Sequence, residues 1–217
     1  MKEEKVSPFE YYVILDFEAT CDQGKPPGPQ EIIEFPSVLM SGQTFEIIDE
    51  FTSFVRPMHH PQLTPFCTEL TGISQHQVDS APLFPEVMAN HIAWLRSHNL
   101  QVTTGDPGES FAFITCGDWD LSRMLPNQCR VCDPPRNFIP YAYRQWINIK
   151  WHYTAFRGTK KAPGMAGMMR GLGLDLVGHH HSGIDDSRNI ARIAQLLGES
   201  GVALTITHRS NPPKTED

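Results

Sequence analysis

Residues Tyr11–Thr20 have the sequence YYVILDFEAT, which predicts a central strand with two acids at its end. The first five residues are apolar, and a short run that is apolar on both faces is typical of a strand inside a covered sheet. Side chains two residues apart on a strand point to the same side. Asp16 and Glu18 therefore project together, either as two solvated acids or as a pair that needs a cation between them.

The segments that follow predict an α/β fold with a mixed five-stranded sheet flanked by helices. Residues 31–40 and 44–57 predict a hairpin beside the first strand, and apolar runs at 111–116 and 145–150 predict two more strands. A hairpin followed by alternating helices and strands is typical of a mixed sheet covered by helices. Helical spacing of apolar residues predicts short helical turns within 63–79 and helices at 81–98, 118–125, 151–158, 163–176 and 184–200. The glycines and proline of residues 105–110 predict a turn.

Length and composition predict one domain. With 217 residues, of which 40% are hydrophobic, the chain can form one α/β domain with a full core, and two small domains are the alternative. The expected bounds are a loose lead-in at 1–10, the folded domain at 11–207 and a flexible tail at 208–217.

Charge and cysteine content exclude several classes of protein. The formal net charge of −7 argues against a protein that coats nucleic acid by bulk positive charge, but not against a local grip on a short strand. The five cysteines lack framework spacing, and the chain has no signal-peptide pattern or membrane-length apolar run. We therefore expect an intracellular protein, in the cytoplasm or nucleus, without membrane association. Cys129 and Cys132 have the spacing of a zinc site or a redox pair, but no second such pair and no histidine at zinc spacing follows. Their segment, residues 129–140, is expected to be irregular.

A third acid, Asp186, is predicted to face the core. Asp186, Ile190, Ile193 and Leu197 step by four, three and four residues, which places them on one stripe of a helix. Acids are almost never buried in such a stripe without a partner. The alternative is an acid that only complements the helix dipole, which is the role expected for Asp185.

Two more residues are candidates for the same site. Asp118 is predicted to cap the helix at 118–125, which leaves Asp120 free for another role; an exposed helical acid is the alternative. His181 lies in a loop five residues before Asp186 and can deprotonate a water at neutral pH. The alternative for His179–His181 is three solvated histidines or adventitious metal binding.

The four carboxylates predict a metal site. Such a set can hold two Mg²⁺ ions roughly 4 Å apart, which activate a water and stabilise the leaving oxygen in phosphodiester hydrolysis. Mg²⁺, or Mn²⁺ in its place, is favoured over Zn²⁺ because all the ligands are oxygen. The basic and aromatic residues of 150–161 either contact a phosphate backbone and its bases or form a solvated helix.

Several motifs resemble those of a known enzyme family. The motifs of DEDDh exonucleases, which have the ribonuclease H-like fold, are similar to four stretches of this chain: ILDFEAT, ELTGIS, the WD of GDWDLSRML and HSGIDDSRNIARIA. DFEATC, EIIEFP, WINI and GIDDSRNIARIA are similar to those of the histone-mRNA 3′-exonuclease and enhanced-RNAi exoribonuclease family. The resemblance covers about Tyr11 to Thr207. It implies a metal-dependent 3′-to-5′ exoribonuclease that acts on the 3′ end of single-stranded RNA and releases nucleoside 5′-monophosphates.

The resemblance also implies roles for single residues. It makes His181 the general base, assigns contacts with the terminal nucleotide to Glu18, Ala19 and His181, and places the metal ions on Asp16, Glu18, Asp120 and Asp186. Trp119, next to Asp120, either borders the substrate or packs on the core. Within that family, the chain is identified with the prion-protein-interacting subgroup, which implies the prion protein as a possible partner. A DNA exonuclease with the same site and a non-catalytic binding scaffold are the alternatives.

Overall fold

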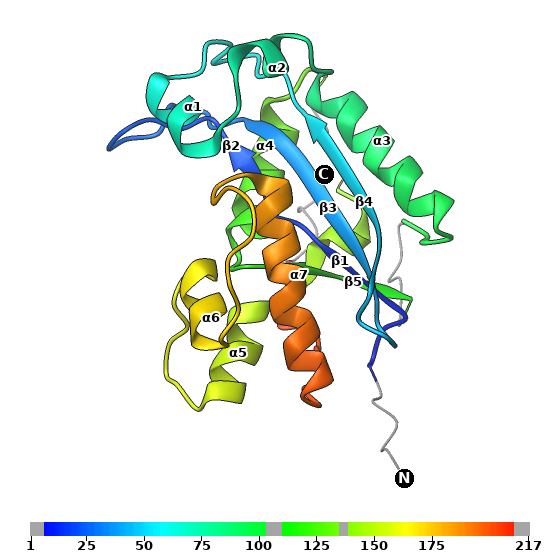
Figure 1. The fold of residues 1–217 in the computed structure, drawn as a ribbon. Helices are drawn as coiled ribbons and strands as arrows, with labels where there is room; N and C mark the ends of the chain where they lie inside the picture. The colour runs from blue at the N-terminus through cyan, green and yellow to red at the C-terminus, as the bar shows by residue number, and fades with distance from the viewer. Residues whose placement is uncertain (1–6, 103–109, 135–138, 211–217) are drawn as a thin grey trace.

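The computed structural model describes residues 7–102, 110–134 and 139–210. The turn predicted at 105–110 lies almost wholly outside these residues, as do most of the predicted lead-in and tail. Figure 1 shows a mixed sheet with helices on both sides. Among the described residues, no helix is long and apolar enough to cross a membrane.

The strand that was predicted from Tyr11–Thr20 lies inside the sheet. It is β1 (Tyr11–Ile14), which pairs antiparallel with β3 (Ile32–Ser41) and parallel with β5 (Phe111–Thr115). The hairpin partner β4 (Ile47–Phe54) pairs with β3, and β6 (Gln145–Asn148) continues the sheet parallel to β5. These five strands confirm the predicted mixed sheet.

Two short strands were not predicted and bring the described sheet to seven strands. Glu18–Ala19 forms β2, which pairs with β3, and His208–Arg209 forms β7, which pairs antiparallel with β6. The sheet thus continues two residues past Thr207, the predicted end of the domain, to Arg209. Two-residue strands have no periodicity, so only their pairing partners define them.

Most of the predicted helices are confirmed. Residues 129–131, which were expected to be irregular, instead form the last turn of α4, and the side chains of Cys129 and Cys132 are buried in the core. A π-helical turn at Asp120–Met124 precedes α4, and a 3₁₀ turn at Tyr141–Arg144 precedes β6. The α-helices are α1 (Pro65–Thr71), α2 (Gln75–Asp79), α3 (Phe84–Ser97), α4 (Leu125–Val131), α5 (Ile149–Arg157), α6 (Met165–Gly171) and α7 (Gly183–Glu199).

Alternating side chains of β1 contribute to two cores, one on each face of the sheet. Val13 and Leu15 pack with residues of α3 and α4. Tyr12 and Ile14 pack on the opposite face with residues of α5, α6 and α7. Figure 1 shows this division, with α5, α6 and α7 gathered on one side. A strand that is covered on both faces can present polar groups only beyond its end, and Asp16 lies two residues after the last residue of β1.

Candidate active site

Three of the predicted carboxylates converge at the end of β1. Asp16 follows β1, Glu18 lies in β2, and Asp186 lies in the first turn of α7. One carboxylate oxygen from each lies within 4.8 Å of those of the other two. Asp186 is only 2% exposed, which agrees with the helical spacing that placed it on the core-facing stripe.

Asp120 lies beside this group and is hydrogen-bonded to the segment that connects β1 with β2. It is 4% exposed, and its Oδ1 accepts the backbone N–H of Phe17 at 3.0 Å. The structure therefore excludes an exposed helical acid. The predicted cap is wrong, however, because the carboxylate of Asp118 accepts the indole N–H of Trp146 at 2.9 Å and pairs with His208 at 3.1 Å. The helix opens with a π turn, so no side chain caps it at this end.

Three acids of the site, Asp16, Glu18 and Asp120, have pKa values above their usual range. Burial raises the pKa of Asp16 well above its usual range, and neighbouring acid charges, first that of Asp120, raise it further. Burial and then the charge of Glu34 raise the pKa of Glu18 to about 9. Burial also raises the pKa of Asp120 to about 6, although the hydrogen bond from the backbone N–H of Phe17 and the charge of Lys150 oppose this rise.

This electrostatic arrangement fits a bound divalent cation. Crowded buried carboxylates either stay protonated or share a cation. The three converging groups, on Asp16, Glu18 and Asp186, offer oxygen ligands only, the set that Mg²⁺ and Mn²⁺ prefer. The residues present therefore fit the predicted metal site.

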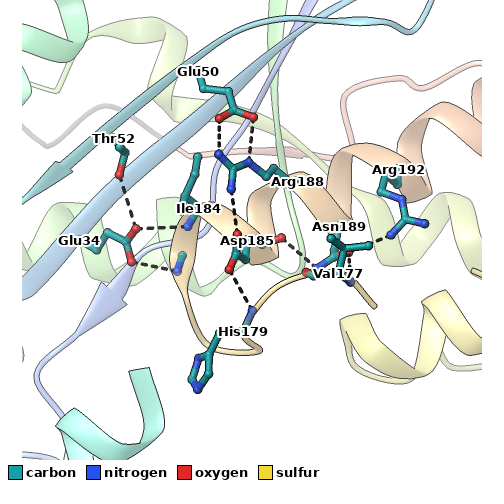
Figure 2. Close-up of polar contacts among 11 residues, drawn as sticks. Glu34, Glu50, Thr52, Val177, His179, Ile184, Asp185, Arg188, Asn189 and Arg192 are labelled. Carbon is teal, nitrogen blue, oxygen red and sulfur yellow. Dashed lines mark hydrogen bonds and ion pairs between the residues drawn. The ribbon is translucent and has the colours of Figure 1, made fainter. Parts of the chain in front are cut away.

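Glu34, which the sequence analysis did not single out, connects the sheet with α7. It is 3% exposed and lies opposite Glu18 in the β2–β3 pairing. Figure 2 shows its carboxylate accepting two backbone N–H groups at the start of α7, from Gly183 at 2.9 Å and Ile184 at 3.3 Å. Its signal in the sequence was an acid inside an otherwise apolar strand, but the capping of a distant helix requires the three-dimensional structure.

Gly183 allows this close approach. A Cβ at this position would lie 2.7 Å from the carbonyl oxygen of Asp16 and 3.1 Å from Oε2 of Glu34. A contact of 2.7 Å with a backbone atom cannot be relieved by rotating a side chain. The helix that carries Asp186 can therefore pack against the end of β1 only with glycine here.

Hydrogen bonds and ion pairs hold the loop that contains His179–His181 against α7 (Figure 2). The carboxylate of Asp185 accepts the backbone N–H of His179 at 2.9 Å. Arg188 donates to Asp185 at 2.9 Å and to both carboxylate oxygens of Glu50 on β4, at 2.9 and 2.6 Å. Asp185 therefore orders the loop before the helix, in addition to its expected place in the first helical turn.

His181 lies at the edge of the carboxylate group. Its φ of 70° is left-handed, and its backbone N–H donates to Oδ2 of Asp186 at 3.0 Å. Partial burial, and next the charge of His180, lower the pKa of His181, so the ring is neutral at pH 7 and able to accept a proton. The ring that bonds Asp186 is that of His180, with Nδ1 3.0 and 3.2 Å from the two oxygens.

The remaining candidates flank the site. Trp119 precedes Asp120 and is 40% exposed, whereas Ala19 is buried in β2. Lys150 lies in the first turn of α5, close enough to lower the pKa of Asp120, and the neighbouring Trp151 is 61% exposed. The start of the basic segment thus faces the acids.

Comparison with known proteins identifies the family. The family model described as Exonuclease, RNase_T, matches residues 13–194. The chain belongs to this exonuclease family.

Relatives of this exonuclease domain include characterised proteins. ERI1 exoribonuclease 3 of Homo sapiens is 45% identical over 193 residues, which are 89% of this chain and 55% of the relative. The 3′-5′ exoribonuclease 1 of Mus musculus is 41% identical over 205 residues, 94% of this chain and 57% of the relative. The chain thus spans about half the length of the curated relatives it matches.

Solved structures agree with the exonuclease fold. The nuclease domain of 3′hExo, a DEDDh family member bound to rAMP, is 40% identical with a TM-score of 0.84, and the match covers 93% of this chain and 98% of that one. A 3′-exonuclease that recognises the histone mRNA stem-loop has a TM-score of 0.86 at 38% identity, with 97% of this chain and 71% of that chain covered. The predicted ribonuclease H-like α/β fold is confirmed.

Proposed function

We propose that this domain is a metal-dependent 3′-to-5′ exoribonuclease that hydrolyses RNA from its 3′ end to nucleoside 5′-monophosphates. The observation that carries the proposal is the convergence of Asp16, Glu18 and Asp186, with Asp120 bonded to the backbone N–H of Phe17, between the first two. The relatives named exoribonucleases support the direction of cleavage and the RNA substrate.

The four carboxylates, Asp16, Glu18, Asp120 and Asp186, are the proposed ligands of two Mg²⁺ ions, for which Mn²⁺ can substitute. When bound, the ions supply water activation and stabilisation of the leaving oxygen. The raised pKa values of Asp16 and Glu18 support this assignment, because such carboxylates need a cation to be ionised at neutral pH.

His181 is the proposed general base, and it takes the proton of the attacking water on an imidazole nitrogen. Its lowered pKa keeps the ring neutral at pH 7, as a base requires. Glu18 and the backbone of Ala19 are proposed to contact the terminal ribose, where the 2′-OH distinguishes RNA from DNA. The exposed ring of Trp119 is proposed to stack on the terminal base.

A labelled single strand tests the proposal. Single-stranded RNA with a 5′ label is incubated with the protein and either Mg²⁺ or a chelator, beside a DNA strand of the same sequence. We expect a ladder of 3′-shortened products that requires Mg²⁺, is lost in Asp16→Ala, and forms faster on RNA. Purely internal cuts or an intact strand would refute the exonuclease activity. Faster cleavage of DNA would show that DNA, and not RNA, is the preferred substrate.

Within the family, we propose that the chain belongs to the prion-protein-interacting subgroup, with the prion protein as a partner. The support is the resemblance of motifs such as EIIEFP and GIDDSRNIARIA to those of the family that includes this subgroup. Co-precipitation of the two purified proteins tests the partner, and recovery equal to that on a blank resin would reject it.

A further inference from the structure

We propose that His180, His181 and Asp186 form a second metal site, selective for a borderline divalent ion such as Zn²⁺, and that an ion bound there inhibits the nuclease. The inhibitory part rests on the proposed function; the binding part does not. One potential ligand atom from each residue lies within 4.8 Å of the other two.

The donors of this site differ from those of the carboxylate group. Two imidazole nitrogens and one carboxylate oxygen suit Zn²⁺, whereas Mg²⁺ prefers oxygen alone. Three protein ligands with a position left for water is also a common arrangement around Zn²⁺. The two sites therefore select different ions, although Asp186 belongs to both.

The geometry is close to that of a bound ion. Nδ1 of His180 lies 3.0 Å from Oδ2 of Asp186. Two ligands at tetrahedral positions around Zn²⁺ are about 3.4 Å apart, so an ion replaces the shared proton with little movement. The rings of His180 and His181 stack with centroids 4.0 Å apart and an angle of 15° between their planes. A small rotation of either ring brings the second nitrogen to the ion, and 42% of the His180 side chain is exposed to solvent.

Occupation of this site removes two groups from the proposed reaction. An ion on Asp186 competes for an oxygen that the Mg²⁺ site requires. The same ion holds the nitrogen lone pair of His181, which then cannot accept a proton. Zn²⁺ and activity are therefore mutually exclusive, and His180 is the one member of the trio without a role in the proposed reaction.

Zinc binding is measured without any nuclease assay. Chelator-treated protein is titrated with Zn²⁺ at pH 7 against a chromophoric competitor. We expect one tightly bound ion per chain and an affinity at least tenfold lower in His180→Gln. His179→Gln is the matched control, since the His179 ring belongs to neither ligand group while its backbone N–H bonds Asp185. Asp16→Asn should bind Zn²⁺ as the wild type does, because Asp16 lies outside the trio.

Inhibition is then measured on RNA in excess Mg²⁺. We expect Zn²⁺ to inhibit the wild type and His179→Gln alike, and His180→Gln to need at least tenfold more Zn²⁺, with the inhibition of each variant measured relative to its own rate in Mg²⁺ alone. Equal zinc affinity in His180→Gln and the wild type overturns the site, whatever the nuclease assay gives. So does a loss of zinc affinity in His179→Gln as large as that in His180→Gln. Zinc binding as expected in a protein inactive with Mg²⁺ would keep the site and reject the proposed function.

Discussion

At the scale of single residues, the proton on Glu18 couples metal binding to stability. The folded protein raises the pKa of Glu18 from 4.5 to about 9, so over this range it binds a proton that the unfolded chain releases. The stability that this proton contributes is complete below about pH 4.5 and is lost as pH rises through about 9. A cation in the carboxylate group replaces that proton, and metal binding should therefore stabilise the protein more at high pH.

The first prediction follows from this coupling. In chelator, the melting temperature should fall as the pH rises from 5 to 9, and added Mg²⁺ should raise it more at pH 9 than at pH 5. Glu18→Gln should weaken the pH dependence because its side chain does not titrate, and Asp16, whose pKa is also raised, should account for part of what remains. Thermal unfolding followed by circular dichroism measures all three, and a wild-type melting temperature that rises over this range in chelator would contradict the raised pKa.

The second prediction separates the structural role of Asp120 from its proposed metal role. Asp120→Asn keeps an oxygen for the N–H of Phe17, so its stability should stay near that of the wild type. Its activity should still fall by more than the roughly 10–100-fold typical for loss of an outer-shell partner of a metal. Asp120→Ala also leaves a buried N–H unpaired and should cost a further ~1–3 kcal/mol in the free energy of unfolding. Urea denaturation and RNA cleavage by both variants check this, and full activity in Asp120→Asn would remove Asp120 from the metal site.

At the scale of elements, the start of α7 depends on a strand for its cap. Ser182 makes no side-chain capping bond, and Glu34 on β3 accepts the N–H groups of Gly183 and Ile184 instead. Glu34→Ala should therefore lower the free energy of unfolding by ~1–3 kcal/mol, and Glu34→Gln by less because it retains one acceptor. Glu46→Ala, at an exposed glutamate, should change it by less than about 0.5 kcal/mol. Urea denaturation measures these values, and equal effects of Glu34→Ala and Glu46→Ala would disprove the cap.

The fourth prediction concerns the loop that carries the histidines. Asn189 bonds both backbone groups of Val177, and the Glu50–Arg188–Asp185 chain holds the amide of His179. Arg188→Met should cost no more than about 1 kcal/mol, because these ion pairs are partly exposed. It should nevertheless speed amide hydrogen exchange at His179 and lower kcat more than it raises KM. Unchanged exchange at His179 would show that Asn189 alone fixes the loop.

At the scale of the whole molecule, the sequence predicted what depends on a repeating pattern. The apolar run of β1, the two strand-forming segments of the β3–β4 hairpin and the stripe of α7 are local features, so the sequence alone located them. The pairings of β2 and β7 and the cap from Glu34 join segments far apart in the chain, and no local pattern encodes them. Asp118 was mistaken for a cap because its real partners, Trp146 and His208, come from strands β6 and β7.

The last prediction concerns how an acidic domain attracts RNA. A chain with a net charge of −7 must attract RNA locally, and Lys150, whose charge acts on Asp16 and Asp120, is placed to do so. Lys150→Gln should raise the KM for RNA several-fold and reduce the slope of log affinity against log salt by about 0.7, the value for one phosphate contact on a single strand. Arg96→Gln makes the same change in net charge from an exposed position on α3, across the sheet from α5, and should alter neither quantity. If both variants shift the salt dependence equally, RNA responds to the net charge of the domain rather than to a cation at its active site.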